Sequence, residues 1–435
     1  MEKLFRLKEN NTTIRREILA GLTTFLTLAY ILAVHPGMLG EIGNGMTPGA
    51  VFTATAISSA IATFVMAFAA NLPIALAPGM GLNAFFTYTV VFGMGYSWQV
   101  ALTAVFIEGA LFVILSLFNV REAIVKAIPP SLKKAVPVGI GLFIALIGLS
   151  NAGVVVGSGN TIIGLGDLGA ATPLLAIVGF AIVIVLHALK IPGAILIGIL
   201  ATTIIGIPLG VTVFPQGWSP IGSPESPLFF RFDFSAVLSF KFFMVLLTFL
   251  FVDIFDTVGT LVGVTTQAGL SDKNGNIPRV KQAFLADAVG TVAGSALGTS
   301  TVTSFVESTT GIAAGGRTGL TALSTGVFFL LALFLSPVFL LIPSAATAPA
   351  LIFVGFLMVK SVTSIDFTKP AEGIPAFLCI IMIPFAYSIA EGIVYGALSF
   401  VILKVATRKL SDITLVMWIL FIIFTLRFVF SYFIN

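Results

Sequence analysis

The sequence contains few charged residues and almost no cysteine. Only 9% of its 435 residues are Asp, Glu, Lys or Arg, whereas soluble globular chains carry about 25%. The single cysteine, Cys379, excludes a disulfide framework. The chain also lacks Walker A, HExxH and CxxC motifs, and it has no GxSxG sequence in a strand–helix context. Because no ATPase module is present, any active transport must be driven by an ion gradient.

Apolar residues make up most of the chain. Hydrophobic residues make up 58% of the chain, and the mean hydropathy is +1.12. The 43 Gly and 21 Pro are typical of closely packed and interrupted membrane helices. The composition therefore predicts an all-α polytopic membrane protein. The net charge of +4 arises from basic residues at span ends, which indicates membrane orientation and not a nucleic-acid partner.

Apolar runs predict about 14 membrane spans, since a span needs about 20 apolar residues and fewer where a helix is broken. The predicted spans are 17–35, 48–70, 74–94, 99–117, 135–152, 172–188, 192–213, 241–268, 282–298, 301–315, 318–341, 347–360, 374–388 and 391–406. A further apolar run, 413–432, is either a fifteenth crossing or a membrane-surface helix.

Basic residues predict the orientation of these spans. If the N-terminus is cytoplasmic and the spans alternate, the cytoplasmic side collects all of the 22 Lys and Arg except Arg231, Lys241 and Arg427. Such a bias is typical of plasma-membrane proteins that follow the positive-inside rule. The sequence therefore predicts a multi-pass plasma-membrane protein with a cytoplasmic N-terminus.

The long loop 214–240 separates seven spans from seven. An odd number in each half inverts the second half relative to the first, as in many secondary transporters. The third span is interrupted at NLPIALAPGMGLNAFF and the tenth at GTSTVTSFVESTTGIAAGG, at corresponding places in the two halves. Paired interruptions of this kind predict a substrate site near the midplane of the membrane.

The eighth span carries a polar face. Asp253, Asp256, Thr257 and Thr260 share one side of a helix, because they are spaced i, i+3, i+4 and i+7. One interpretation is a buried polar seam that hydrogen-bonds a neighbouring helix. The other is a face that lines a water-filled or substrate cavity. We favour this interpretation because acids inside membrane spans rarely serve only to hold neighbouring helices together.

The interrupted spans carry two further candidates. Glu307 has no Lys or Arg in its own span, so we expect backbone N–H groups at the restart of the broken helix to hold it. Alternatively it is protonated, or it serves only as a helix cap. Asn83 either caps a half-helix or presents a donor and an acceptor in one plane to a flat heterocycle. Phe85 and Phe86 offer rings for stacking, although the default for either is the core.

Three other titratable residues are interpreted as structural. Glu108 lies within the fourth span, and we expect it to pair with the site helices or with a polar residue. His35 and His187 are placed at span ends, where a lone interfacial histidine is more often structural than a proton relay.

Several long stretches resemble the AzgA-like purine nucleobase permeases, a branch related to the nucleobase–ascorbate transporters. The matching blocks include NLPIALAPGMGLNAFF, FVDIFDTVGTLVGV and ADAVGTVAGSALGTSTVTSFVESTTGIAAGGRTGLTAL. The resemblance covers nearly the whole chain and implies the inverted seven-plus-seven fold of the uracil transporter. It implies a core domain (1–134 and 241–345, spans 1–4 and 8–11) and a gate domain (135–240 and 346–435, spans 5–7 and 12–14).

The resemblance also implies site residues. Asp253 and Glu307 look like the principal base ligands, with Asn83 and Asp256 as supporting or coupling residues. Phe85 and Thr257 complete the predicted substrate site, and Glu307 or Asp256 is the predicted proton-coupling group. One departure is that relatives usually carry Asn-Pro where this chain has His35 and Pro36, which adds a titratable group there.

The predicted function is uptake of adenine, guanine or hypoxanthine by proton symport, with sodium as the alternative ion and alternating access as the mechanism. No enzyme activity, cofactor or metal is expected. The expected partners are a purine nucleobase and the lipid bilayer, with a homodimer left open. The rival functions are an anion transporter or channel, or a pyrimidine or xanthine carrier, on the same fold. A non-transporting receptor or scaffold is disfavoured because no large soluble loop is present.

Overall fold

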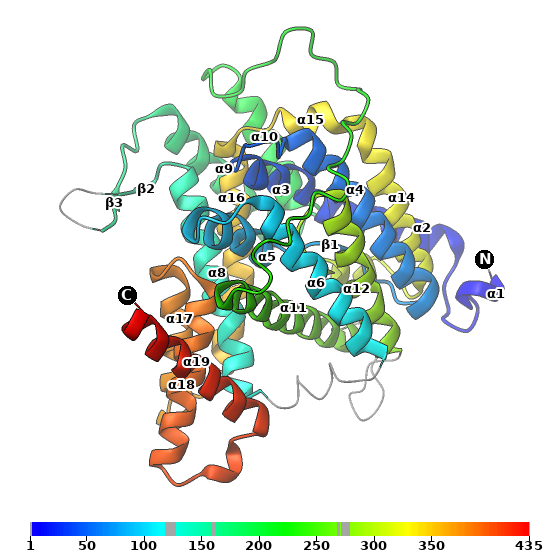
Figure 1. Ribbon diagram of the computed structural model, residues 1–435. Helices are drawn as coiled ribbons and strands as arrows, with labels where there is room; N and C mark the ends of the chain where they lie inside the picture. The colour runs from blue at the N-terminus through cyan, green and yellow to red at the C-terminus, as the bar shows by residue number, and fades with distance from the viewer. Residues whose placement is uncertain (1, 118–127, 158–161, 268–269, 271–278, 435) are drawn as a thin grey trace. The chain divides into compact units, whose positions relative to one another are not determined.

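The computed structural model describes residues 2–117, 128–157, 162–267, 270 and 279–434, and these residues are predominantly helical (Figure 1). The chain divides into two compact units. Unit 1 comprises Met1–Leu117 and Ile147–Phe353, and unit 2 comprises Phe118–Leu146 and Val354–Asn435. The division into core and gate domains stays a prediction. Arg121, Lys126 and Lys273, which the topology prediction assigns to the cytoplasmic side, lie outside the described residues.

Each predicted span of the first half corresponds to helical structure. After the short α1 (Glu2–Phe5), the elements are α2 (Ile14–Leu28), α3 (Ile31–Gly40), α4 (Pro48–Val65), the π-helix η1 (Met66–Ala70), β1 (Leu76–Pro78), α5 (Met80–Ala84), the π-helix η2 (Phe85–Gly93), α6 (Trp98–Leu117), α8 (Pro130–Asn151), α9 (Ala171–Ala188) and α10 (Ala194–Gly206). A two-stranded hairpin that the sequence did not predict, β2 (Val155–Val156) with β3 (Gly164–Leu165), precedes α9.

The second half matches its predicted spans in the same way. Its elements are α11 (Phe240–Gln267), α12 (Val280–Leu297), β4 (Val302–Ser304), α13 (Ser308–Ala313), α14 (Gly319–Ala332), η3 (Leu333–Leu335), α15 (Ser336–Leu340), α16 (Ser344–Val359), η4 (Lys360–Ser364), α17 (Pro370–Phe385), α18 (Ile389–Ala406), η5 (Leu410–Asp412) and α19 (Leu415–Ile434). The apolar run 413–432 is therefore a helix, and its crossing of the membrane stays a prediction.

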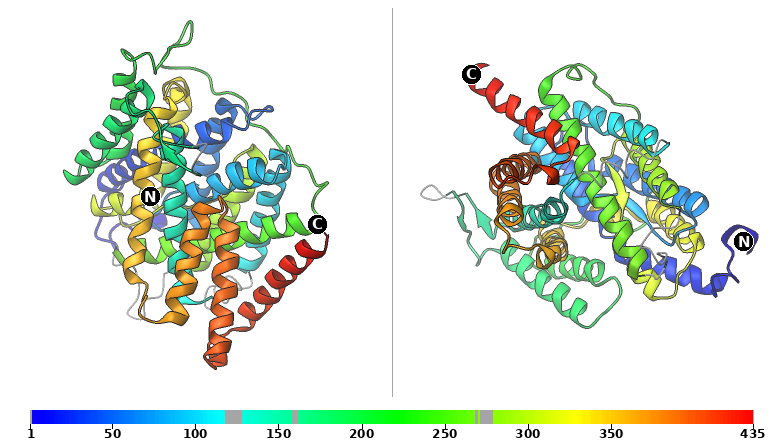
Figure 2. Two further views of the ribbon diagram at one scale, coloured as in Figure 1. Left: turned by 90° about the vertical axis from the view of Figure 1, so that its left-hand side faces the viewer. Right: turned by 90° about the horizontal axis from the view of Figure 1, so that it is seen from below.

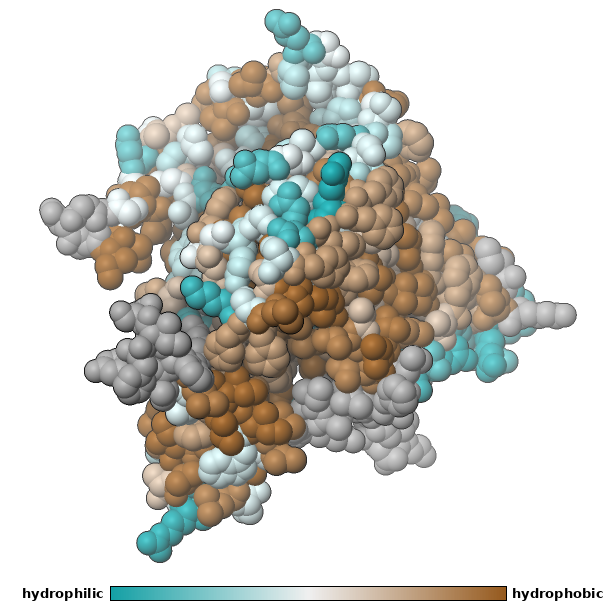
Figure 3. Space-filling model, in the orientation of Figure 1, coloured by the Kyte–Doolittle hydropathy of each residue, from teal (hydrophilic) through white to brown (hydrophobic). Residues whose placement is uncertain are grey.

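The length and hydropathy of the helices support a chain that crosses the membrane several times. Among the described residues, eight helices are long and apolar enough to cross a membrane, and four shorter apolar helices accompany them. Exposed apolar side chains such as Ile184, Leu331 and Phe334 lie on these helices. Much of the face shown in Figure 3 is accordingly hydrophobic. An exposed apolar surface of this extent is expected where lipid, and not water, is the solvent.

The first span differs from its prediction. It was predicted at 17–35, but it extends from Ile14 to Gly40 and is broken between α2 and α3 at Ala29 and Tyr30. His35 consequently lies within α3 and is fully buried, with 0% of its surface exposed. The prediction that His35 is an interfacial residue at a span end is wrong. The apolar run alone did not reveal that the helix continues past Pro36.

The two interrupted spans meet through their backbones. β1 and β4 form an antiparallel pair in which Leu76 faces Ser304 and Pro78 faces Val302. Figure 2 shows β4 as an arrow among the helices of unit 1 in its right-hand view. Antiparallel pairing is what two inverted repeats produce when their equivalent segments approach each other. The predicted interruptions of the third and tenth spans are confirmed.

One threonine supports each strand on its open side. Thr63 of α4 bonds through Oγ1 to both N–H and C=O of Leu76, at 3.0 and 3.2 Å. Thr291 of α12 does the same for Val302, at 3.2 and 3.1 Å. Backbone polar groups within a membrane need partners inside the protein. Two equivalent helices thus supply equivalent side chains, which is a local sign of the inverted repeat.

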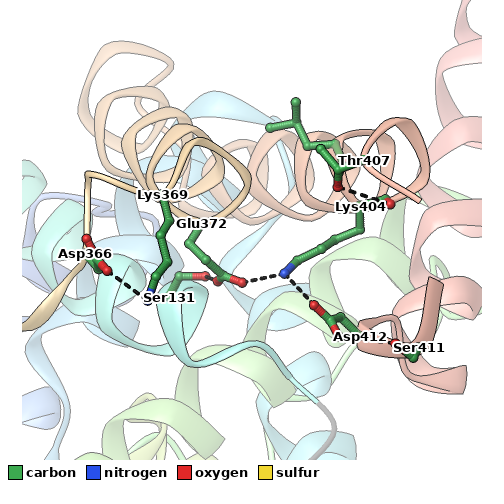
Figure 4. Close-up of polar contacts among 9 residues, drawn as sticks. Ser131, Asp366, Lys369, Glu372, Lys404, Thr407, Ser411 and Asp412 are labelled. Carbon is green, nitrogen blue, oxygen red and sulfur yellow. Dashed lines mark hydrogen bonds and ion pairs between the residues drawn. The ribbon is translucent and has the colours of Figure 1, made fainter. Parts of the chain in front are cut away.

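Unit 2 is held at one end by an ion cluster around the buried Lys404 (Figure 4). Lys404 of α18 contacts Glu372 of α17 at 2.7 Å and Asp412 of η5 at 2.8 Å. Ser131 of α8 donates to the second oxygen of Glu372 at 2.6 Å. The cluster therefore joins the start of α8, the start of α17, the end of α18 and the segment that leads to α19.

Asp412→Asn should lower the melting temperature at neutral pH but not in acid. The hydrogen bond from Lys404 holds the pKa of the Asp412 carboxyl below its usual value. A lowered folded pKa stabilises the fold above the ordinary value of about 4, and this stabilisation is lost as the pH falls through the lower folded pKa. Thermal unfolding of the variant and the wild-type protein should therefore differ at pH ~6 and converge near pH ~3.

The matched control for this prediction is Asp167→Asn. Asp167 lies in the loop before α9 and accepts from the backbone N–H of Gly169, two residues away. Its replacement should leave the melting temperature nearly unchanged. A difference between Asp412→Asn and wild type that persists at low pH would contradict the role of the ionised Asp412.

Candidate functional site

The candidate site is built where the interrupted spans cross, within unit 1. β1 leads into α5, which carries Asn83, and β4 leads into α13, which follows Glu307. α11 contacts β4, α5 and α13 and carries Asp253, Asp256 and Thr257. The structure thus brings together side chains from three segments that are far apart in the sequence.

Asn83 is fully buried and its amide orientation is defined. Its Nδ2 donates to the carbonyl of Pro78 at 3.3 Å, and its Oδ1 accepts from the hydroxyl of Ser300. The first contact lies within the third span, and the second joins that span to the tenth. Asn83 therefore connects the two broken spans. The half-helix cap considered from the sequence is wrong, because Asn83 lies inside α5 and the N-cap of that helix is Gly79.

A buried network surrounds Thr257 on α11. Its Oγ1 lies 2.8 Å from Asp287 Oδ1, 3.3 Å from Asp253 Oδ1 and 2.8 Å from Thr303 Oγ1. Asp253, Thr257 and Asp287 have no exposed surface. Because one hydroxyl donates one proton, the shorter contact to Asp287 is the better donor bond. This part of the polar face of α11 is a buried seam that joins α11 to α12 and β4.

Asp256, which directly precedes Thr257 on α11, is more exposed than that seam. Its side chain is half-buried. Asp256 packs closely against Gly79. A Cβ at this glycine would lie 3.3 Å from Asp256 Oδ2 and 2.5 Å from Thr303 Cγ2. The glycine before α5 therefore leaves room for a carboxylate at the junction of β1 and α5. Asp256 also interacts electrostatically with Asp287 and Glu307.

Glu307 is also half-buried, and its hydrogen-bond partner is a tyrosine. The hydroxyl of Tyr30, at the break between α2 and α3, donates to Glu307 Oε1 at 2.9 Å. Glu307 occupies the N-cap position of α13, but its side chain forms no capping hydrogen bond. The interpretation of Glu307 as a side-chain cap of α13 is wrong. The expectation of backbone N–H partners is met in part, because the backbone N–H of Glu307 itself, at the start of the restarted helix, bonds to the carboxylate.

Phe85 begins the π-helix after α5 and is fully buried. Its ring packs edge-on against Phe249 of α11, with the ring centroids 4.8 Å apart. The contact joins the third span to the eighth. Whether Phe85 also contacts a substrate ring stays a prediction.

Two acids outside this set have structural partners. Glu108 of α6 is buried and accepts from the hydroxyl of Thr301 at 2.7 Å, in agreement with the expected polar pairing. Glu17 of α2 is buried and accepts from the backbone N–H of Arg317, Thr318 and Thr321. Glu17 thus joins α2 to the N-terminus of α14, an interaction that the sequence analysis did not predict.

Asp287 and Tyr30 are the site residues that the sequence analysis missed. Asp287 lies within the ninth span, so the criterion applied to Asp253 and Glu307, an acid inside an apolar segment, would have found it. Tyr30 carries a weaker signal, a single hydroxyl in the apolar run LAYIL. Neither residue is close in sequence to the side chain that it contacts.

Thr257→Val should destabilise the protein, because it removes the hydroxyl that joins two buried carboxylates and Thr303. Loss of a buried hydrogen-bond partner costs about 1–3 kcal/mol. The measurement is thermal unfolding of the purified protein. Thr260→Val, one turn further along the same helix at a half-buried position, is the matched control and should have a smaller effect. Equal effects of the two variants would show that the network contributes nothing specific.

The described part of the chain contains no group of three or more His, Cys, Asp or Glu residues arranged to hold a metal ion. The four acids near the crossing are accompanied instead by hydroxyl and amide groups. This set of side chains suits a neutral ligand that carries N–H donors, because carboxylates accept such hydrogen bonds strongly.

Comparisons with known proteins give a consistent result. The xanthine/uracil permease family model, described as "Permease family", matches residues 15–395. The guanine/hypoxanthine permease PbuG of Bacillus subtilis (strain 168) is 45% identical over 441 residues, covering 99% of this chain and 100% of that protein. The adenine permease AdeP of Escherichia coli (strain K12) is 41% identical over 437 residues, covering 99% of this chain and 96% of that protein.

The fold also resembles a solved structure. The transmembrane domain of a cyanobacterium bicarbonate transporter, BicA, superimposes with a TM-score of 0.67. The match covers 87% of this chain and 97% of that chain at 16% sequence identity. At this identity the likeness concerns the fold alone. It confirms the predicted fold of seven-plus-seven inverted repeats.

Proposed function

The chain belongs to the nucleobase–ascorbate transporter family of permeases, and on that basis we propose that it is a secondary active transporter of purine nucleobases. It is a multi-pass membrane protein and a transporter, not an enzyme. The proposed substrate is adenine, guanine or hypoxanthine. We place the protein in the plasma membrane with a cytoplasmic N-terminus, and a homodimer is its proposed assembly.

One observation carries the proposal: among the acids at the crossing of the broken spans, Glu307 and Asp256 are the two that are not fully buried. A neutral purine presents ring and exocyclic N–H groups, and a carboxylate accepts such groups in charge-assisted hydrogen bonds. An adjacent protonated carboxyl can donate to a ring nitrogen or carbonyl of the base. The pair therefore offers the acceptors and the donor that recognition of a purine edge requires.

The fully buried residues of the site hold together the spans that carry Glu307 and Asp256. Thr257 holds α11 against α12 and β4 and bonds to Asp253 within α11, and Asn83 holds the third span against the tenth. Asp253 and Asn83 remain proposed base ligands, reached when the broken spans separate during transport. Phe85 forms the apolar floor on the side of α11.

Coupling to protons follows from the same residues. Desolvation favours the protonated form of a carboxyl, so proton uptake at Glu307 or Asp256 and binding of a neutral base favour each other. We propose a proton as the coupling ion, with sodium as the alternative. The core domain (1–134 and 241–345) then moves against the gate domain (135–240 and 346–435) to alternate access to the site.

An anion is a poor substrate for this site, although the fold is shared with a bicarbonate transporter. An anion site requires a cation or unoccupied helix N-termini, whereas the side chains here are carboxylates and hydroxyls. Fold therefore does not decide function, and the residues at the crossing favour a neutral base.

Proteoliposomes test the proposed function directly. Purified wild-type protein should accumulate labelled adenine, guanine or hypoxanthine when an inward proton gradient is imposed, and an ionophore that collapses the gradient should abolish accumulation. A sodium gradient in place of the proton gradient tests the alternative ion. Uptake of bicarbonate, uracil or xanthine without uptake of these three purines would overturn the proposed substrate class.

A further inference from the structure

Three consecutive hydroxyl residues before β4 contact three different segments of the first half. Thr299 Oγ1 lies 2.6 Å from His35 Nε2, Ser300 donates to Asn83 Oδ1, and Thr301 donates to Glu108 at 2.7 Å. All of these side chains are fully buried. The run 299–301 is therefore the point at which α3, α5 and α6 are joined to the start of the tenth span.

His35 is the member of this arrangement that the proposed function leaves without a role. Its ring lies wholly inside the protein, and its only side-chain hydrogen bond with the described residues is the contact to Thr299. Its Nδ1 has no hydrogen-bond partner there. A buried polar atom without a partner is costly, and an apolar side chain would fill the same position without that cost. Packing alone therefore does not account for an imidazole in α3.

The hydrogen bond from His35 to Thr299 lies one residue away from a contact with the proposed base site. Ser300 follows Thr299 directly and holds the amide oxygen of Asn83. The carbonyl of Thr301 accepts from the backbone N–H of Gly79 at 3.1 Å, and Gly79 is the glycine against which Asp256 packs. A displacement of the run 299–301 would therefore move two of the proposed base ligands relative to the others.

We propose that His35 is a positioning residue for purine affinity. Through Nε2 it fixes Thr299, and Thr299 in turn places Ser300 and Thr301 so that Asn83 and Gly79 take their positions. This inference rests on the proposed function, because it concerns the affinity of the same site. His35 itself touches no ligand in this arrangement, so its replacement affects binding through the hydrogen bond to Thr299.

The test compares variants on both sides of the hydrogen bond. Dissociation constants for the transported purine are measured by isothermal titration calorimetry on the purified, folded fraction of each variant. His35→Leu and Thr299→Val should each weaken binding about threefold to tenfold, the value of one hydrogen bond. The double variant should bind no more weakly than either single variant, because both remove the same contact.

Two conservative variants separate positioning from packing. His35→Gln keeps an amide at about the reach of Nε2, and Thr299→Ser keeps the hydroxyl. Both should retain purine affinity within about twofold of wild type, whereas a packing role would not be restored by these changes in shape. If His35→Leu does not fold, the pair Thr299→Val and Thr299→Ser carries the test from the other side of the contact.

The outcomes are distinguishable from failure of the proposed function. In proteoliposomes the single variants should show a raised KM for the purine with an unchanged maximal rate per folded protein. Wild-type protein that binds no purine would overturn the proposed function and this inference together. Wild-type affinity in folded His35→Leu or Thr299→Val, with only a lower melting temperature, would overturn the positioning role and leave the proposed function intact.

Discussion

Glu307→Gln is expected to abolish purine accumulation while leaving the protein folded. Glutamine has nearly the same shape as glutamate, but it replaces one acceptor oxygen by a donor NH2 group. That group opposes the N–H of a bound purine, and it cannot take up a proton. Loss of a hydrogen bond to a charged group weakens binding by about 10-fold to 100-fold. Accumulation against a gradient should fall further, because coupling requires a group that titrates.

Uptake of labelled purine in proteoliposomes measures this effect, and counterflow of purine without a proton gradient separates binding from coupling. Glu9→Gln is the matched control, because Glu9 is an exposed acid that pairs at 3.7 Å with exposed Arg6. It should transport as wild type does. Tyr30→Phe removes only the hydroxyl that donates to Glu307 Oε1 and should have an intermediate effect on KM. Normal accumulation by Glu307→Gln would refute the assignment of this residue.

Glu17→Leu is expected to have the largest effect on stability. The two oxygens of Glu17 accept from the backbone N–H of Arg317, Thr318 and Thr321, at 2.9, 3.2 and 3.1 Å. The hydroxyls of Thr318 and Thr321 also donate to Glu17, at 2.8 and 2.7 Å. All of these groups lie at the N-terminus of α14, where negative charge is favoured. A leucine of similar size would remove this acceptor from the N–H groups of Arg317 and Thr318 and from the two hydroxyls, whereas the N–H of Thr321 would keep its bond to the carbonyl of Thr318.

Each unsatisfied buried donor costs about 1–3 kcal/mol, so the sum should exceed about 3 kcal/mol. We expect a melting temperature lower by at least ~5 °C, or loss of folded protein from the membrane. Thermal unfolding monitored by size-exclusion chromatography measures this change. Glu9→Leu, at an exposed position of the same N-terminal region, is the control. A melting temperature of Glu17→Leu within a degree or two of wild type would contradict the capping role.

Some of the candidate site was predictable because its signals are local. Glu307, Asp253 and Asp256 are recognisable as acids in apolar segments without knowledge of what surrounds them. The interruptions that carry Asn83 and Glu307 are recognisable from Pro, Gly, Ser and Thr in otherwise apolar runs. Asp287 satisfies the same criterion as the other acids and is therefore also recognisable from the sequence.

The partners of these acids were not predictable, since each depends on contacts between distant segments. Tyr30 and Glu307 are 277 residues apart. The backbone N–H partner of Glu307 is local and was predictable, whereas the Tyr30 hydroxyl, at the break between α2 and α3, was not. Likewise, His35 was assigned to an interface because Pro36 follows it, whereas the helix continues to Gly40.

The spans, the inverted repeat, the two interruptions and the acids in apolar segments are all predictable from the amino-acid sequence. These properties follow from hydropathy and residue spacing, which act over one or two helical turns. The folded structure is needed to see which acids remain partly exposed, which are buried in the Thr257 network, and which residues hold them. The physical reason is that burial and hydrogen bonding of a side chain depend on the side chains of other segments that contact it. The pairs in this site are assembled by the antiparallel meeting of β1 and β4.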